Sequence, residues 1–189
     1  MCLIALSVVK SKDWNGKDSY FFKVVANRDE YHERQTTQMH WWSNKPILAG
    51  KDELAGGTWL GTNKEGKFAA ITNLKESNDR KYQSSRGSLV TDYLESNESA
   101  KTYLENLEPD KDNFAGFNLI VGDKHGLFYL CNRMEGIFFL NEGTHALGNL
   151  TLNASTQKVE AIKMDLDGLL HEGFSQAKAI ALMKKDYGS

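Results

Sequence analysis

The sequence opens with Met1-Cys2-Leu3-Ile4-Ala5-Leu6-Ser7-Val8-Val9, and a second apolar run from Tyr20 to Ala26 leads into Asn27-Arg28-Asp29-Glu30. Both runs are rich in aliphatic, β-branched and aromatic residues, and the turn residues Asn15-Gly16 lie between them. This pattern predicts a β-hairpin with strands at Cys2 to Val9 and Ser19 to Ala26. We expect the rest of the chain to form the scaffold and walls around this hairpin.

Cys2 has the most distinctive chemistry in the hairpin. Removal of Met1 would leave a thiol and a free α-amine on one residue. An α-amine titrates near pH ~8 and a thiol near pH ~8.5, so the two groups can form a nucleophile with its own base. Alternatively, Cys2 is a small apolar residue that opens a buried strand. Its position alone leaves both interpretations open.

The composition indicates one globular domain over residues 1–189. Of the 189 residues, 40% are hydrophobic and 25% are charged, which suffices for a full core. The net charge is −2, the pI is near 6.2, and the basic residues form no stripe, so we expect no nucleic-acid partner.

The sequence also favours a cytoplasmic protein. No apolar run approaches the roughly 18 residues that span a bilayer, and the N-terminus lacks the pattern of a secretory signal. Cys2 and Cys131 have no C-x-x-C spacing, so we expect neither a disulfide framework nor a metal site. A reducing compartment follows as the simpler inference.

The middle of the chain continues the pattern of an antiparallel sheet. The polar segment Arg28 to Thr37 is expected to be a loop or short helix where functional side chains gather. The adjacent indoles of Trp41 and Trp42 either line a ligand cavity or cap the core. Asn63 to Gly66 marks a hairpin turn between two strands. Gly56-Gly57 lacks the ending of a phosphate loop, so we interpret it as a close approach of the backbone to a neighbour or a ligand.

The remaining periodicities predict strands and helices in alternating blocks. Helical spacing of apolar residues covers Ser88 to Leu94, Ser99 to Leu107, Ser155 to Leu170 and Phe174 to Met183. Strands are predicted at Phe114 to Val121, Leu127 to Cys131, Gly136 to Leu140 and Thr144 to Leu147. This order favours an α+β fold with antiparallel sheets over a βαβ repeat.

Several motifs in one order resemble the NRDE family, that of transport and Golgi organisation protein 2. They are the opening Met1-Cys2-Leu3-Ile4, the Ala26-Asn27-Arg28-Asp29-Glu30 string, Gly56-Gly57-Thr58-Trp59-Leu60-Gly61, Ala70-Ile71-Thr72-Asn73 and Ser85-Arg86-Gly87. The family is in turn similar to N-terminal nucleophile hydrolases of the choloylglycine hydrolase and penicillin V acylase type. The resemblance implies a four-layer α-β-β-α sandwich whose first strand begins with the nucleophile.

The resemblance also assigns catalytic roles. Cys2 matches the nucleophile, Asp29 the aspartate beside the thiol, and Asn73 and Asn149 the asparagines that donate to an oxyanion. Arg28 would stabilise a thiolate or a substrate carboxylate. The hydrolases have the motif Arg-Asn-x-Asp, whereas this chain has Ala26-Asn27-Arg28-Asp29, so its arginine is displaced. The alternative for Arg28 and Asp29 is a set of loop-pinning salt bridges, and for the asparagines it is turn hydrogen bonding.

A trafficking role is the other function that the resemblance implies. Family members resemble proteins proposed to mobilise haem and linked to acyl lipids, so the cleft would hold a hydrophobic or planar ligand without turning it over. The expected ligand-binding residues are Asn27, Glu30, Trp41, Trp42, Trp59 and Arg86. No cofactor is required, and haem would be cargo; side chains of the right type for its iron are His32, His40, His125, His145, His171 and Cys2.

The end of the chain departs from the family pattern. The resemblance implies further strands after residue 185, whereas this sequence stops at Asp186-Tyr187-Gly188-Ser189. An uncovered sheet edge would then offer a surface for a homodimer. Sedimentation that shows only monomer at high micromolar concentration would exclude that dimer.

Overall fold

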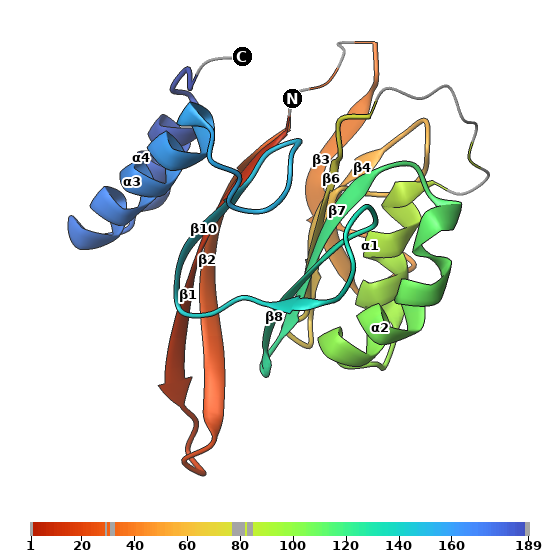
Figure 1. Cartoon of the computed structure of the whole chain (residues 1–189), viewed down its shortest axis with the longest axis horizontal. Coiled ribbons are helices and arrows are strands. Elements are labelled where there is room, and N and C mark those ends of the chain that lie inside the picture. The colour runs from red at the N-terminus through yellow and green to blue at the C-terminus, as the bar shows by residue number, and fades with distance from the viewer. Residues whose placement is uncertain (1, 29, 31–32, 77–81, 83–84, 188–189) are drawn as a thin grey trace.

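Two antiparallel β-sheets lie face to face, and a pair of helices covers the outer side of each, so the fold has four layers (Figure 1). This computed structural model describes residues 2–28, 30, 33–76, 82 and 85–187. The layer order is α-β-β-α, as the family resemblance implied. The predicted α+β class with antiparallel sheets is therefore confirmed.

The smaller sheet contains the N-terminal hairpin. Its strands are β1 (Leu3–Lys12), β2 (Asp18–Asn27) and β10 (Gly143–Leu147), in the order β10-β1-β2. Leu3 pairs with Asn27 across the hairpin, and Asp13 closes the turn by accepting hydrogen bonds from the N–H groups of Asn15 and Lys17. Both predicted strands are confirmed, and each extends further toward the turn.

The larger sheet is an antiparallel meander whose strands follow chain order. They are β3 (Thr36–Trp41), β4 (Ile47–Asp52), β5 (Leu60–Asn63), β6 (Phe68–Asn73), β7 (Phe117–Asp123), β8 (Gly126–Cys131) and β9 (Phe138–Phe139). Two helices and a 3₁₀ turn are inserted between β6 and β7. They are α1 (Arg86–Glu95), α2 (Ala100–Leu107) and η1 (Glu108–Asn113).

Helices α3 (Gln157–His171) and α4 (Gln176–Met183) cover the smaller sheet. Each α-helix in the described part of the chain begins after a hydroxyl side chain that accepts a backbone N–H of the first turn. These caps are Ser85, Ser99, Thr156 and Ser175. Such caps satisfy N–H groups that have no partner inside a helix, which explains why the helix starts lie close to the predicted ones.

Strand β1 takes part in two hydrophobic layers. Ile4, Leu6 and Val8 pack toward the larger sheet, whereas Leu3 and Ala5 pack against the residues of α3 and α4. Successive side chains of a strand point to opposite faces, so a strand buried on both faces reads as an unbroken apolar run. The opening of the sequence therefore fixes β1 as the central strand between two layers.

The prediction of a loop or short helix from Arg28 to Thr37 is wrong at the end of that segment. It is not a loop or short helix throughout, because β3 begins at Thr36 and pairs with Asp52 of β4. The exposed residues of β3 carry little hydrophobic signal, and pairing with β4 is what makes the segment extended. The strands predicted at Phe114 and Gly136 are also shorter than expected, starting at Phe117 and Phe138.

Candidate functional site

A cleft of about 640 Å³ opens beside the first residue of the smaller sheet. Its walls come from the start of β1, the loop after β2, the facing ends of β3 and β4, the end of β6 and the start of α1. The lining residues include Cys2, Arg28, Glu30, Arg34, Lys51, Asp52, Gly57, Trp59, Ile71, Asn73, Arg86 and Gly87.

Cys2 is half-buried and lies directly before β1, in the cleft wall. Pairing of Leu3 with Asn27 on one side, and of Ile4 with Leu147 on the other, fixes where the chain enters the sheet. The position of the thiol is therefore set by the central strand and not by a flexible tail.

Arg28 and Arg34 form ion pairs with two carboxylates at one side of the cleft. The Nη2 atom of Arg28 lies 3.1 Å from Asp52 Oδ2 and 3.5 Å from Glu30 Oε2. Arg34 Nε lies 2.7 Å from the same Asp52 oxygen. We call Arg28, Glu30, Arg34 and Asp52 the loop cluster. It ties the loop after β2 to the end of β4.

Asp52 is the centre of the loop cluster. Burial opposes its ionisation, but the N–H of Ala55 and the guanidinium groups of Arg34 and Arg28 outweigh that effect and lower its pKa. Its other oxygen accepts the N–H groups of Leu54 and Ala55. Asp52 therefore joins the loop and the turn after β4 through one ionised side chain.

Arg86 enters the cleft from the first turn of α1. Its Nη1 donates to the carbonyl oxygen of Gly116 at 2.8 Å, and the N–H of Gly116 donates to Glu76 at 2.8 Å. Burial lowers the pKa of Arg86, while the charges of Glu76 and Cys2 raise it and that of Arg34 lowers it further. Burial is the largest of these effects, so the pKa of Arg86 is lowered overall.

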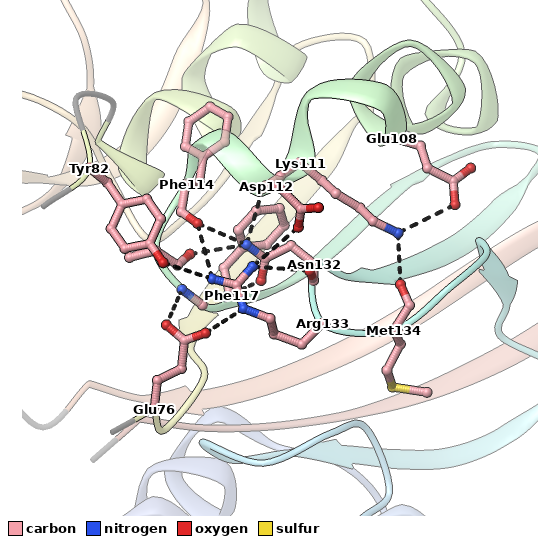
Figure 2. A network of polar contacts seen from close by, with 12 residues as sticks. Glu76, Tyr82, Glu108, Lys111, Asp112, Phe114, Phe117, Asn132, Arg133 and Met134 are labelled. Atoms are coloured by element: carbon pink, nitrogen blue, oxygen red, sulfur yellow. Dashed lines mark hydrogen bonds and ion pairs between the residues drawn. The ribbon is translucent and has the colours of Figure 1, made fainter. Parts of the chain in front are cut away.

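Glu76, which accepts the N–H of Gly116, belongs to a polar network with Arg133 and Tyr82 (Figure 2). Glu76 pairs with Arg133 at 2.5 Å, and Arg133 also bonds to the hydroxyl of Tyr82 at 3.0 Å. Asn132 accepts the N–H of Phe117 and donates to three carbonyl groups of the preceding turn, at Lys111, Phe114 and Ala115. We call Arg86, Gly116, Glu76 and Arg133 the helix cluster.

The two predicted oxyanion asparagines lie together where the two sheets meet. Asn73 ends β6, is exposed and lines the cleft. Asn149 donates its amide to the backbone carbonyl of Asn73 at 2.7 Å, and its own carbonyl accepts the N–H of Lys75. Among the described residues, the Oδ1 of Asn149 is buried without a hydrogen-bond partner. Asn149 thus joins the sheets in this structure, and Asn73 is the asparagine of the two that lines the cleft.

The expectation that Trp41 and Trp42 line the same cleft as Cys2 is wrong. They border a separate hollow of about 410 Å³ at the turn between β3 and β4. Thr36 pairs with Asp52 at the cleft end of this hairpin, whereas Trp41 pairs with Leu48 near the other end. The two indoles therefore border that hollow and not the cleft, although the centre of the Trp42 ring lies 5.9 Å from the Nζ of Lys51, a residue of the cleft wall. Trp59 does line the cleft.

The other expected residues fall into three groups. Glu30 and Arg86 line the cleft, whereas Asn27 does not: it borders a hollow between β2 and α4. Asp29 and His32 lie outside the described residues. Of the described residues that could bind haem iron, only Cys2 lines the cleft, since His40, His125, His145 and His171 lie elsewhere. The described part of the chain contains no cluster of three metal-ligating side chains.

Three cleft residues were not anticipated from the sequence. Arg34, Lys51 and Asp52 reach the cleft because β3 and β4 pair in a register that brings Thr36 opposite Asp52. The polar composition of the loop after β2 was the one local signal that indicated a functional role for residues such as Arg34. No local sequence pattern predicts that β4 ends at Asp52.

In the part of the chain that the structure describes, no helix has the length and apolar character needed to cross a bilayer.

The fold is shared with a solved amidase structure. The structure of the Caenorhabditis elegans N-acylethanolamine-hydrolyzing acid amidase ortholog superposes with a TM-score of 0.55 at 12% sequence identity, over 96% of this chain and 86% of that one. The four-layer sandwich, with a cysteine at the start of its central strand, is therefore an N-terminal-nucleophile-hydrolase-like fold.

Sequence comparison gives the family within that class. Residues 1–185 match the family described as Transport and Golgi organisation 2, and the chain belongs to it. The Bos taurus and Homo sapiens Transport and Golgi organization protein 2 homologs are each 33% identical over 153 residues, which is 76% of this chain and 55% of the relative. The chain spans about half the length of the curated relatives it matches.

Proposed function

We propose that the cleft binds an amphiphilic ligand with an anionic group, either haem or an acyl lipid, as cargo of an intracellular trafficking protein. The charge of the cleft wall is the observation that supports this. Among the described residues, four cationic side chains line it against two carboxylates, although the whole chain has a net charge of −2. The cations are Arg28, Arg34, Lys51 and Arg86, and the carboxylates are Glu30 and Asp52.

The distribution of ion pairs suggests which cations would receive the ligand. Arg28 and Arg34 are matched by Asp52 and Glu30 in the loop cluster. Among the described residues, Lys51 and Arg86 form no ion pair with a carboxylate, so both can meet a carboxylate or phosphate of a ligand. Trp59 and Ile71 add apolar surface, and about 640 Å³ lies in the range of small-molecule sites.

If haem is the cargo, the residues that line the cleft limit the choice of a ligand for its iron. Haem iron takes an axial ligand from His, Cys, Met or Tyr side chains. Since Cys2 is the described cysteine or histidine that lines the cleft, it would be the axial ligand, with the propionates near Lys51 and Arg86. An acyl lipid would need no such ligand, so the two cargoes predict different effects of Cys2→Ala.

Titration with haem, read in the Soret band, and with a fluorescent fatty acid tests the proposal. We expect saturable binding of one of them, weakened about fivefold to tenfold in Lys51→Gln, which corresponds to about 1–1.4 kcal/mol. Lys64→Gln is the matched control, because Lys64 lies over the Trp41 ring in the other hollow. Absence of saturable binding of both ligands would reject the carrier function.

A second candidate is a Cys2 amidohydrolase, and the place of Cys2 at the start of β1 on an amidase-like fold favours it. The thiolate would attack an amide carbonyl, the α-amine would transfer the thiol proton to the leaving amine, and the side-chain amide of Asn73 would donate to the oxyanion. Water would then hydrolyse the thioester and release the acid.

Intact-mass measurement and an amide assay distinguish the two candidates. The hydrolase requires that Met1 be removed and that Cys2→Ala and Cys2→Ser abolish turnover of a fluorogenic fatty-acid amide. The carrier tolerates a retained Met1. A processed N-terminus with turnover that survives Cys2→Ala would contradict the hydrolase mechanism.

A further inference from the structure

We propose that the far end of the β1–β2 hairpin docks the protein on an anionic lipid bilayer. We call residues 9–23 the hairpin tip, and it projects beyond α3 and α4 (Figure 1). Strand β1 has ten residues and begins beside the cleft, so the end of the hairpin lies about 30 Å from Cys2. The inference goes beyond the proposed function, because the same docking would serve a ligand carrier and an amidohydrolase.

The hairpin tip exposes large apolar side chains. Trp14 is 93% exposed, Phe21 61% and Val9 50%. Val9 and Phe21 are directly paired, and they lie on the face of the hairpin that carries Leu3 and Ala5 nearer the cleft. Helices α3 and α4 cover Leu3 and Ala5 but leave Val9 and Phe21 exposed. Single exposed apolar residues are ordinary, whereas three at one end of a hairpin indicate a contact surface.

The turn that carries Trp14 is closed by hydrogen bonds. The N–H of Asp13 donates to the carbonyl of Lys17 at 2.8 Å, and the N–H of Gly16 donates to the carbonyl of Asp13 at 2.9 Å. The Asp13 carboxylate accepts the N–H groups of Asn15 and Lys17. Because this backbone is already ordered, insertion of the indole costs little conformational entropy. An indole has a large apolar ring and a polar N–H, which is why tryptophan concentrates at membrane–water interfaces.

The charge of the hairpin tip is opposite to that of the whole chain. It carries four lysines and two aspartates, a net charge of +2, whereas the chain has −2. The lysines are Lys10, Lys12, Lys17 and Lys23, and the aspartates are Asp13 and Asp18. Lys10 and Lys12 share Asp18, at 2.8 and 2.5 Å. Lys17 and Lys23 form no ion pair with a carboxylate of the described residues, and Lys23 Nζ lies 5.3 Å from the centre of the Phe174 ring.

Two charged residues that bond to the hairpin tip leave this excess unchanged. The carbonyl of Lys124 accepts the N–H of Tyr20 at 3.4 Å, and a carboxylate oxygen of Glu142 accepts the N–H of Lys10 at 2.9 Å. One adds a positive charge and the other a negative charge. Anionic lipids attract lysines near a bilayer surface. Contact between the tips of two copies would instead bring like charges together, so an anionic bilayer is the partner that the charge favours.

Co-sedimentation with vesicles tests the docking. The vesicles contain phosphatidylcholine alone or with about 30% phosphatidylserine, and the bound fraction of protein is measured as lipid is added. We expect the parent protein to bind the anionic vesicles at least about tenfold more tightly than the neutral ones, and salt to release it. Trp14→Ala should weaken binding about tenfold, and Lys17→Gln about threefold to fivefold.

Matched variants show whether the effect is specific to the hairpin tip. Trp41→Ala removes a 47%-exposed indole from the hollow at the turn between β3 and β4, and Lys64→Gln removes a lysine from the same hollow. Both should bind vesicles like the parent. Lys51→Gln changes the cleft, so it should weaken cargo binding and leave vesicle binding unchanged. Because Trp14 is almost fully exposed, a thermal melt should show that Trp14→Ala is folded.

Three results would overturn the docking. They are no binding of the parent protein to anionic vesicles, equal binding of Trp14→Ala and the parent, and equal binding to neutral and anionic vesicles. Without vesicle binding, a dimer that disappears in Trp14→Ala would assign the hairpin tip to a second copy. Vesicle binding lost in Lys51→Gln but kept in Trp14→Ala would show that the cleft itself takes lipid. Failure of vesicle binding while soluble haem or fatty acid still binds rejects only the docking, and the reverse result rejects only the carrier.

Discussion

The loop cluster and the helix cluster both place arginine beside the cleft, but they use it differently. In the loop cluster, two arginines meet two carboxylates, and Asp52 bonds to both guanidinium groups. In the helix cluster, Arg86 bonds to a backbone carbonyl and its nearest carboxylate partner in the network, Glu76, is bonded to Arg133. Ion pairs between arginine and carboxylate hold a loop in place. An arginine that bonds to a neutral carbonyl instead keeps a positive electrostatic potential, which can act on another molecule or on Cys2.

The largest effect on stability is expected from Asp52→Ala. The change removes two ion pairs and leaves two N–H groups of the turn, at Leu54 and Ala55, without their acceptor. Because the Asp52 and Arg28 side chains are only 11% and 17% exposed, we expect a loss of about 2–3 kcal/mol in the free energy of unfolding, measured by urea denaturation.

Asp112→Ala is the matched control in the network behind the helix cluster. Asp112 is 78% exposed and lies 3.4 Å from Arg133, so its removal should cost less than about 0.5 kcal/mol. Equal losses in Asp52→Ala and Asp112→Ala would show that the loop cluster does not hold the loop through its charges.

A smaller loss is expected when the packing beneath the helix cluster is disturbed. In Gly57→Ala the new methyl group meets the backbone of Gly87 at 3.0 Å, so the start of α1 must move, at a cost of about 1–2 kcal/mol. A Cβ at Gly148 meets no heavy atom within 4 Å, and Gly148→Ala should stay within about 0.5 kcal/mol of the parent. Thermal unfolding of both variants is the measurement, and a Gly57→Ala melt like that of the parent would contradict the close approach.

The loop cluster should also weaken in acid. The pKa of Asp52 is lower in the folded chain than its unfolded value of about 3.9, so the stability that it contributes is complete above that value and disappears as the pH falls through the folded pKa. The difference in unfolding free energy between the parent and Asp52→Asn should be constant from pH 5 to 8 and shrink below about pH 4. A difference that grows in acid would mean that the pKa shift has the opposite sign.

The smallest effect is expected from Arg34→Gln. Arg34 shares Asp52 with Arg28 and is 38% exposed, so the remaining pair with Arg28 keeps Asp52 compensated. We expect a loss below about 1 kcal/mol by urea denaturation. A loss equal to that of Asp52→Ala would show that Arg34 alone carries the loop cluster and that Arg28 is available to the cleft.

Local patterns predicted the fold well where both faces of an element are buried or where a cap marks its start. The apolar run of β1 and the serine caps of α1 and α2 are examples. Strand β3 was missed because its six residues are all exposed, so no alternation of buried and exposed side chains records it. Its extended form follows from pairing with β4, which is a contact between segments.

The residues of the candidate site also divide into those that local motifs predicted and those whose place depends on contacts between segments. The sequence indicated Cys2, Asn73 and Arg86 by motif, and the structure brings all three to the cleft. Trp41 and Trp42 were expected there for their chemistry, but strand direction carries them to the other end of the hairpin. Residue type alone contains no information about the end of a strand at which a side chain emerges.

The sequence by itself determined the α+β class and the place of Cys2 before a strand buried on both faces, because consecutive apolar residues in β1 indicate such burial. The four layers were implied by the resemblance of its motifs to a known family. Only the tertiary structure decided which groups meet the cleft arginines Arg28 and Arg86. Arg28 lies closer to Cys2 in the motif, yet Asp52 reaches it through strand pairing, while Gly116, thirty residues beyond Arg86, fixes the other guanidinium. Charge partners separated by so many residues are set by packing, which no local pattern encodes.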